Sequence, residues 1–123
     1  MKAVLISIKP KWCELIASGK KTVEVRKNKP RLETPFKCYI YETLGKREKL
    51  GFVSYAYEGE GKVIGEFVCD RIEEIGFSPY NHGEYICIDQ SFIEQSCIPF
   101  VEMFDYLDEE YGYGWHITDL VIY

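Results

Sequence analysis

The sequence predicts an α+β domain built on a small, mainly antiparallel sheet that curls or closes on itself, with two or three flanking helices. Five or six segments carry the alternating or apolar pattern of strands, and two or three place apolar residues at helical spacing. These segments do not follow the regular strand–helix–strand order of a parallel sheet, which favours antiparallel pairing.

The N-terminal segment predicts a strand followed by a helix. The apolar, β-branched run at residues 3–8 predicts a buried strand. Residues 9–19 predict a helix of about two turns. Pro10 suits a first helical turn, Trp12 begins an apolar i, i+3, i+4 pattern, and Gly19 stops it.

The next two segments predict strands. Residues 21–27 alternate, so Val23 and Val25 are expected to face the core while the charged residues between them face the other way. Residues 36–43 also alternate apolar side chains with lysine and tyrosine, which predicts another half-buried strand.

The middle of the chain predicts a pair of strands joined by a turn. Residues 52–57 and 62–75 have strand composition, and the second strand is the longer. Gly65 lies inside it and marks a bulge or a close approach of another backbone. Residues 76–85 have loop composition.

The C-terminal third predicts helices and a closing strand. Residues 89–95 predict one helical turn or more, and residues 98–112 predict a longer helix with Pro99 near its start. The apolar residues of the longer helix recur at helical spacing: Phe100, Met103, Phe104 and Leu107. Two glycines, at 112 and 114, are expected to end it. Residues 115–123 predict a strand with four residues on one side: Trp115, Ile117, Asp119 and Val121.

Size and composition predict one globular domain over residues 1–123. The chain is 46% apolar, 28% charged and 15% aromatic, and it shows no repeat or interdomain linker. Its five cysteines are an odd number without metal-binding spacing, so we expect reduced, mostly buried thiols. No secretory leader or membrane-length apolar run is present, which predicts a cytoplasmic protein without membrane contact.

Charge is distributed unevenly along the chain. Residues 1–31 hold nine Lys and Arg against two Glu, a net +7, whereas the remainder holds six against eighteen, a net −12. The total of −5 argues against a nonspecific nucleic-acid binder. A basic face on an acidic body remains able to act locally, because charges are screened over about 8 Å at physiological salt. Alternatively, the basic N-terminal segment and the acidic remainder neutralise each other in the folded protein.

Three pieces of the chain carry a family resemblance: "ISIKPKWCELIASGKKTVEVRK" at 6–27, "GKVIGEF" at 61–67 and "GWHITDLVIY" at 114–123. In this order, and over essentially the whole chain, they resemble the ASCH domain family, a branch of the PUA-like superfamily. The resemblance implies a small β-barrel with flanking helices and a positively lined cleft beside the Gly-Lys-Lys-Thr turn. It also implies RNA binding or RNA metabolism, with hydrolases among the members.

A small bacterial branch that removes the acyl group from N4-acetylcytidine is similar at greater distance. It uses a lysine, a threonine and a glutamate, and Lys21 matches the lysine. Glu24 stands at the threonine position, where a carboxylate cannot act as a hydroxyl nucleophile. Thr22 or a water oriented by Glu24 would then be the nucleophile, and Glu94 matches the assisting glutamate.

Residue chemistry around the turn predicts a site for an anionic or polar ligand. Arg26 offers a planar fork to a phosphate, lysines offer point charges, and Glu24 accepts hydrogen bonds from an exocyclic amine. Tyr41 and Trp115 are candidate faces for base stacking, whereas His116 is expected to be structural. The predicted ligand-binding residues are Lys9, Lys20, Lys21, Glu24, Arg26, Tyr41 and Trp115.

Three functions remain open from the sequence. The first is binding of RNA, a nucleotide or a modified nucleoside in the basic cleft. The second is deacylation of an N4-acetylcytidine-like nucleoside by a small amidohydrolase. The third is a noncatalytic adaptor whose acidic helix binds another protein. No metal or cofactor is expected, because metal-ligand spacings, P-loop, dinucleotide and nucleophile-elbow motifs are absent from the sequence.

Overall fold

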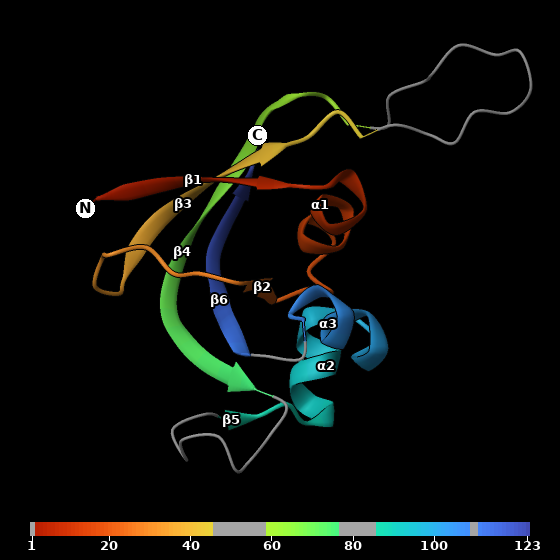
Figure 1. Ribbon diagram of the computed structural model, residues 1–123. Coiled ribbons are helices and arrows are strands. Elements are labelled where there is room, and N and C mark those ends of the chain that lie inside the picture. Colours follow the sequence, from red (N-terminus) through yellow and green to blue (C-terminus); the bar gives the residue numbers. More distant parts are fainter. Residues whose placement is uncertain (1, 46–58, 77–85, 109–110) are drawn as a thin grey trace, which may run out of the picture.

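This computed structural model describes residues 2–45, 59–76, 86–108 and 111–123. In these ranges the chain forms six strands and three helices (Figure 1). They are β1 (Ala3–Ile8), α1 (Pro10–Ala17), β2 (Val23–Arg26), β3 (Phe36–Glu42), β4 (Lys62–Gly76), β5 (Ile86–Cys87), α2 (Gln90–Ser96), α3 (Phe100–Tyr106) and β6 (Tyr111–Ile122).

The strands form one curled, mixed sheet in the order β1-β3-β4-β6-β2, and the short β5 pairs with β4. The β1–β3 and β4–β5 pairs are parallel, while the other three are antiparallel. Figure 1 shows the long β4 and β6 curving down one side of the view, with the three helices on the other. The predicted α+β fold is confirmed, and the curled sheet is an open half-barrel with β1 and β2 at its two edges.

Two apolar clusters pack against the sheet, on opposite faces of β2 and β6. One gathers α1 with β1, β3 and β4 around buried Ile6, Ile16, Phe36 and Phe67. The other gathers α2 and α3 against Val23 and Val25 of β2, and Trp12 packs against both clusters. Strand β2 therefore lies between two packed regions. Because of this position, its residue Glu24 is buried although it is charged.

Several predicted elements are confirmed. Helix α1 begins at Pro10 and ends before Gly19, whose φ of +82° permits the turn. A Cβ at Gly65 would lie 2.6 Å from the carbonyl oxygen of Val121, so the expected close backbone approach is present. The predicted strand at 52–57 and most of the loop at 76–85 lie outside the described residues.

The first strand is only half buried, because Leu5 is 61% exposed while Ile6 and Ile8 are buried. As an edge strand of the half-barrel, β1 has one face covered and one face in solvent. The prediction of a buried strand was wrong for this reason.

The C-terminal boundaries also differ from the prediction. Helix α3 ends at Tyr106, and β6 already begins at Tyr111, so it includes the two glycines expected to be breakers. A Cβ at Gly112 would lie 2.6 Å from Leu107, and one at Gly114 the same distance from the Phe92 ring. These glycines let the helices pack directly on the strand.

The faces of α3 and β6 depart from the expected periodicity as well. Met103 of α3 and Leu107, which follows it, are buried, but Phe100 is half exposed. In β6 the alternation is interrupted near Asp119, whose φ is +49°, and the pairing register with β4 shifts there.

Candidate functional site

The turn after α1 is held by backbone hydrogen bonds at both ends. The N–H groups of Lys20 and Lys21 both donate to the carbonyl oxygen of Leu15, at 3.1 and 3.0 Å. The N–H of Thr22 donates to Gln95 in α2, and the carbonyl of Thr22 accepts from Ile117 in β6. This anchoring fixes the direction in which the Lys21 side chain leaves the backbone.

Lys21 points into the protein. Its side chain is completely buried, and Nζ donates to the carbonyl oxygen of Ser96 at 2.7 Å. Nζ also lies 3.4 Å from Glu24 Oε1 and 5.1 Å from the centre of the Trp12 ring. Burial lowers the pKa of Lys21, and the nearby carboxylate of Glu24 offsets part of that effect.

Glu24 links this buried lysine to the surface. Its Oε2 lies 3.6 Å from Arg26 Nη1, and that guanidinium donates to the carbonyl oxygen of Ser7 at 3.1 Å. Along Lys21, Glu24 and Arg26 the exposed fraction of the side chain rises from 0% to 6% to 31%. The chain of contacts thus runs from the dry interior to solvent, and Arg26 bridges the open side of the half-barrel from β2 to β1.

A groove of about 440 Å³ opens above this chain of contacts, between β1, α1, β2 and α3; we call it the central groove. It contains the cations of Lys9, Lys11 and Arg26 and the carboxylates of Glu24 and Glu102. Lys11 and Glu102 form a solvent-exposed ion pair across it at 3.4 Å. The described residues that line it are Ser7, Ile8, Lys9, Lys11, Trp12, Glu24, Val25, Arg26, Ile98, Glu102 and Tyr106.

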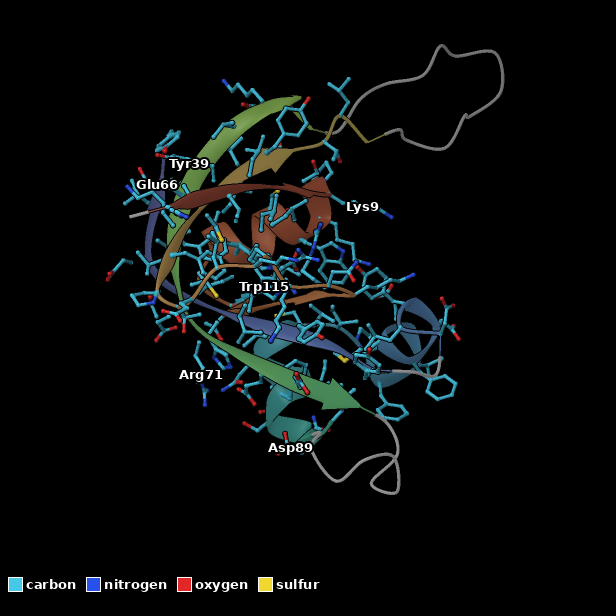
Figure 2. All side chains as sticks on the ribbon, turned by 60° about the vertical axis from the view of Figure 1, so that its left-hand side comes forward. Lys9, Tyr39, Glu66, Arg71, Asp89 and Trp115 are labelled. Carbon is cyan, nitrogen blue, oxygen red and sulfur yellow. The ribbon has the colours of Figure 1, made fainter. Side chains whose placement is uncertain are left out.

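The central groove brings together four of the residues expected at a site. Lys9, Glu24 and Arg26 line it, and Lys21 lies directly behind Glu24. Lys9 is exposed at the start of α1, and its side chain extends away from the sheet in Figure 2. The contacts among Lys21, Glu24 and Arg26 therefore join residues near both ends of the segment 21–27, which the sequence predicted as one charged strand.

The other expected residues lie elsewhere. Lys20 and Thr22 are exposed on the turn and do not line the central groove. Glu94 is exposed on α2, where its carboxylate accepts from Gln90 at 3.4 Å. Tyr41 lies on β3 opposite Val63 and does not line the groove.

Trp115 and His116 have structural contacts. The Trp115 ring is buried, meets Phe36 edge to face at 5.7 Å and donates from Nε1 to the carbonyl oxygen of Asn28. Trp115 is therefore part of the core and forms the base of a different hollow. His116 contacts Glu73 and Arg71 of β4, which agrees with the structural role expected for it.

Sequence reasoning missed several residues of the groove. Lys11 and Trp12 directly follow the first strand, so their place on the first turn of α1 was a usable local signal. Glu102, Tyr106 and Ile98 reach the groove only because α3 folds back over α1 and β2. No local pattern signals such a contact.

The thiol of Cys13, on α1, is buried. Cys13 faces a hollow of about 430 Å³ that lies beside Pro10, Glu14 and Glu42. Burial and the charge of Glu42 raise the pKa of Cys13 to about 12. A thiol with that pKa is protonated at neutral pH and is a poor nucleophile.

The described part of the chain contains no helix long and apolar enough to cross a bilayer. Within those same residues no three His, Cys, Asp or Glu side chains lie close enough together to hold a metal ion.

The open half-barrel, the helices packed against it and the groove at its open side define an α+β half-barrel domain. The sequence profile of the ASCH domain matches residues 6–113, so the chain belongs to the ASCH domain family. No curated protein matches the chain significantly.

Solved structures support the same fold. The chain is similar to the ASCH protein of Zymomonas mobilis, with 20% identity and a TM-score of 0.63 over 96% of this chain and 68% of that one. A mutant form of that protein gives 19% identity and a TM-score of 0.65, over 99% and 73% of the two chains. At these identities the likeness establishes the fold alone.

Proposed function

We propose that this ASCH domain binds RNA, or a nucleotide or modified nucleoside, in the central groove. The observation that carries the proposal is the connected series Lys21, Glu24 and Arg26, which presents a carboxylate and a guanidinium side by side at the groove floor. A volume of about 440 Å³ falls within the range typical of small-ligand sites.

The groove supplies the contacts that a nucleotide requires. Arg26 offers N–H groups to a phosphate, and Lys9 and Lys11 add mobile positive charge at the rim. Glu24 offers carboxylate oxygens to an exocyclic amine of a base. The rings of Trp12 and Tyr106 in the lining provide faces for stacking, worth about 1–3 kcal/mol per base.

The test is binding of a fluorescently labelled, mixed-sequence single-stranded RNA to wild type and to Lys9→Gln/Arg26→Gln. We expect the double variant to lose roughly tenfold or more in affinity, because two cations of the groove are removed. Wild-type affinity should fall linearly with salt on logarithmic axes. The matched control is Lys2→Gln/Lys62→Gln, which removes two exposed lysines outside the groove. Equal losses in the two variants would overturn the proposal, and a wild type that does not bind the RNA would exclude RNA as the ligand.

A second candidate is the amidohydrolase, and one observation favours it. The buried Lys21 has a lowered pKa and lies behind Glu24, which lines the groove, and such a setting helps a lysine act as a base. Thr22 and Glu94 lie outside the groove, so a water oriented by Glu24 is the remaining nucleophile. That water would attack the acyl carbon of an N4-acetylcytidine-like substrate, giving a carboxylic acid and the free amine.

This second candidate is tested by incubating the protein with N4-acetylcytidine and measuring the released cytidine by chromatography. Glu24→Gln is the sharpest variant because it keeps the shape of the side chain and removes its charge. If wild type releases cytidine and a folded Glu24→Gln does not, the chain is an amidohydrolase. If wild type releases none, this function is excluded for that substrate while RNA binding stands on its own test.

A further inference from the structure

A second hollow lies on the other side of the Arg26 side chain; we call it the side groove. Its volume is about 420 Å³, close to that of the central groove. It is lined by Val4, Leu5, Ile6, Arg26, Lys27, Asn28, Lys29, Pro30, Tyr106 and Trp115. Arg26 and Tyr106 line both grooves, so the two hollows meet at these two side chains.

The two grooves differ in charge. The central groove contains three cations and two carboxylates, Glu24 and Glu102. Among the residues that the structure describes, the lining of the side groove contains three cations, Arg26, Lys27 and Lys29, and no carboxylate; Asp108 lies beside it as the partner of Lys27. Electrostatics therefore favours a phosphate in the side groove more strongly than in the central one.

The two lysines of the side groove, Lys27 and Lys29, are not locked into strong pairs. Lys27 Nζ lies 3.6 Å from Asp108 Oδ2, and both side chains are more than half exposed. Such a pair contributes little in water and exchanges readily for a phosphate. Lys27 Nζ also lies 5.2 Å from the centre of the Tyr106 ring, and Lys29 Nζ lies 5.6 Å from that of Tyr113. The lysines can therefore bind a phosphate, and the neighbouring tyrosine rings can stack on a base.

The backbone beneath these lysines is held in place. The buried Trp115 donates from Nε1 to the carbonyl oxygen of Asn28 at 3.3 Å, which ties residues 27–30 to strand β6. Arg26 is tied in turn to Ser7 of β1. A site whose backbone is fixed before binding loses less conformational entropy when a ligand arrives.

We infer that the side groove binds the sugar-phosphate backbone of the nucleotide next to the one held in the central groove. The ligand class is then single-stranded RNA of at least two or three nucleotides, with one base in the central groove and the chain continuing across Arg26 and Tyr106. A base that enters a groove must be unstacked, and single strands provide such bases. This inference rests on the proposed function and assigns Lys27 and Lys29 to the site.

The experiment compares a long and a short ligand on the same variants. Lys27→Gln/Lys29→Gln is tested against a mixed-sequence RNA hexamer by fluorescence anisotropy, and against the four nucleoside 5′-monophosphates by calorimetry. The matched control is Lys2→Gln/Lys62→Gln, which changes net charge equally outside both grooves. Circular dichroism verifies that each variant is folded.

We expect wild type to bind the hexamer more tightly than any monophosphate. Lys27→Gln/Lys29→Gln should weaken hexamer binding by roughly tenfold and lower the logarithmic salt slope by about 1.4, the value for two phosphate contacts on a single strand. Binding of the monophosphates should change by less than about twofold, since Arg26, which lines both grooves, still offers its N–H groups to their single phosphate in this variant.

Three results would overturn the inference while leaving the proposed function intact. They are equal losses for hexamer and monophosphate, hexamer binding unchanged from the control variant, and a wild type that binds hexamer and monophosphate equally well. If wild type binds neither ligand, the proposed function fails and the inference fails with it.

Discussion

Two networks of lysine and glutamate lie on opposite faces of the same curled sheet. In the inner network, Glu24 contacts Lys21 at 3.4 Å and Arg26 at 3.6 Å. In the outer network, Glu66 contacts Lys37 at 2.7 Å and accepts from the Tyr123 hydroxyl at 2.9 Å. Figure 2 shows Glu66 with Tyr39 on the side of the molecule away from Lys9. The outer contacts are shorter, yet burial makes the inner network the more consequential for folding.

The pKa directions show the difference. Burial lowers the pKa of Lys21, because the charged ammonium has lost its water. In the outer network, the hydrogen bond to Glu66 raises the pKa of Lys37, and the hydrogen bond from Lys37 lowers the pKa of Glu66. At the surface the hydrogen-bond partner is the main cause of the pKa shift, whereas for the buried Lys21 the main cause is the loss of water.

The largest effect is therefore expected at Lys21. Lys21→Ala leaves the Glu24 carboxylate buried with only Arg26 beside it and removes the donor to the Ser96 carbonyl. Breaking a buried pair from one side costs about 3–5 kcal/mol. Urea unfolding followed by circular dichroism measures the loss, and a loss below about 1 kcal/mol would show that the inner pair is not dry.

The control for Lys21→Ala removes both charges. Lys21→Met/Glu24→Leu replaces the pair by apolar side chains of similar length, so neither partner is left alone. We expect this variant to recover most of the lost unfolding free energy, because buried pairs contribute little net stability over apolar replacements. A double variant as unstable as Lys21→Ala would instead show that the ammonium group itself is needed.

Local signals in the sequence predicted much of the fold. Pro10 and Gly19 delimit α1, and the alternation of residues 36–42 gives β3, because each depends on the residues themselves. The early start of β6 was not predictable. In the sequence alone, Gly114 interrupts the strand pattern. Only the structure shows why the strand has glycine there, because the Phe92 ring of α2 packs against this position.

The site was predictable in part for the same reason. The charged strand identified Lys21, Glu24 and Arg26 as neighbours, but it did not distinguish a buried lysine from an exposed one. Burial of Lys21 depends on Ser96, which lies 75 residues further along the chain. Thr22 and Glu94 were expected from a resemblance in sequence, and their placement outside the groove depends equally on tertiary packing.

A second prediction tests how dry the inner face is. Burial raises the pKa of Cys13 and Cys38 to about 12 and that of Cys69 to about 11, from an ordinary 9.0. Above pH 9 the unfolded chain loses these protons while the folded chain keeps them, so stability falls as pH rises toward 12. Each thiol should lower the free energy of unfolding by about 1 kcal/mol between about pH 8 and pH 10.

Comparing wild type with Cys38→Ala isolates one of these thiols. The variant loses packing at every pH, but its unfolding free energy should fall less steeply in alkali than that of wild type. Lys21 acts in the opposite direction. Its lowered pKa means that the unfolded state binds the extra proton, so its contribution rises toward pH 10.5 in both proteins and cancels in the comparison. Parallel pH curves would show that the Cys38 thiol is not shielded from water.

The smallest effect is expected in the outer network, despite its short contacts. Glu66→Gln removes the charge that Lys37 and Tyr123 share, but water replaces it at little cost because these side chains are exposed. The melting temperature should change far less than in any Lys21 variant, and the change should disappear in about 1 M salt, where charges are screened within about 3 Å. The lowered pKa of Glu66 means that its stabilisation is present at neutral pH and is lost as pH falls through that pKa, so wild type and Glu66→Gln should converge in acid. If Glu66→Gln instead destabilises the protein as much as Lys21→Ala and does so at high salt, contact length rather than burial ranks the two networks, and the comparison fails.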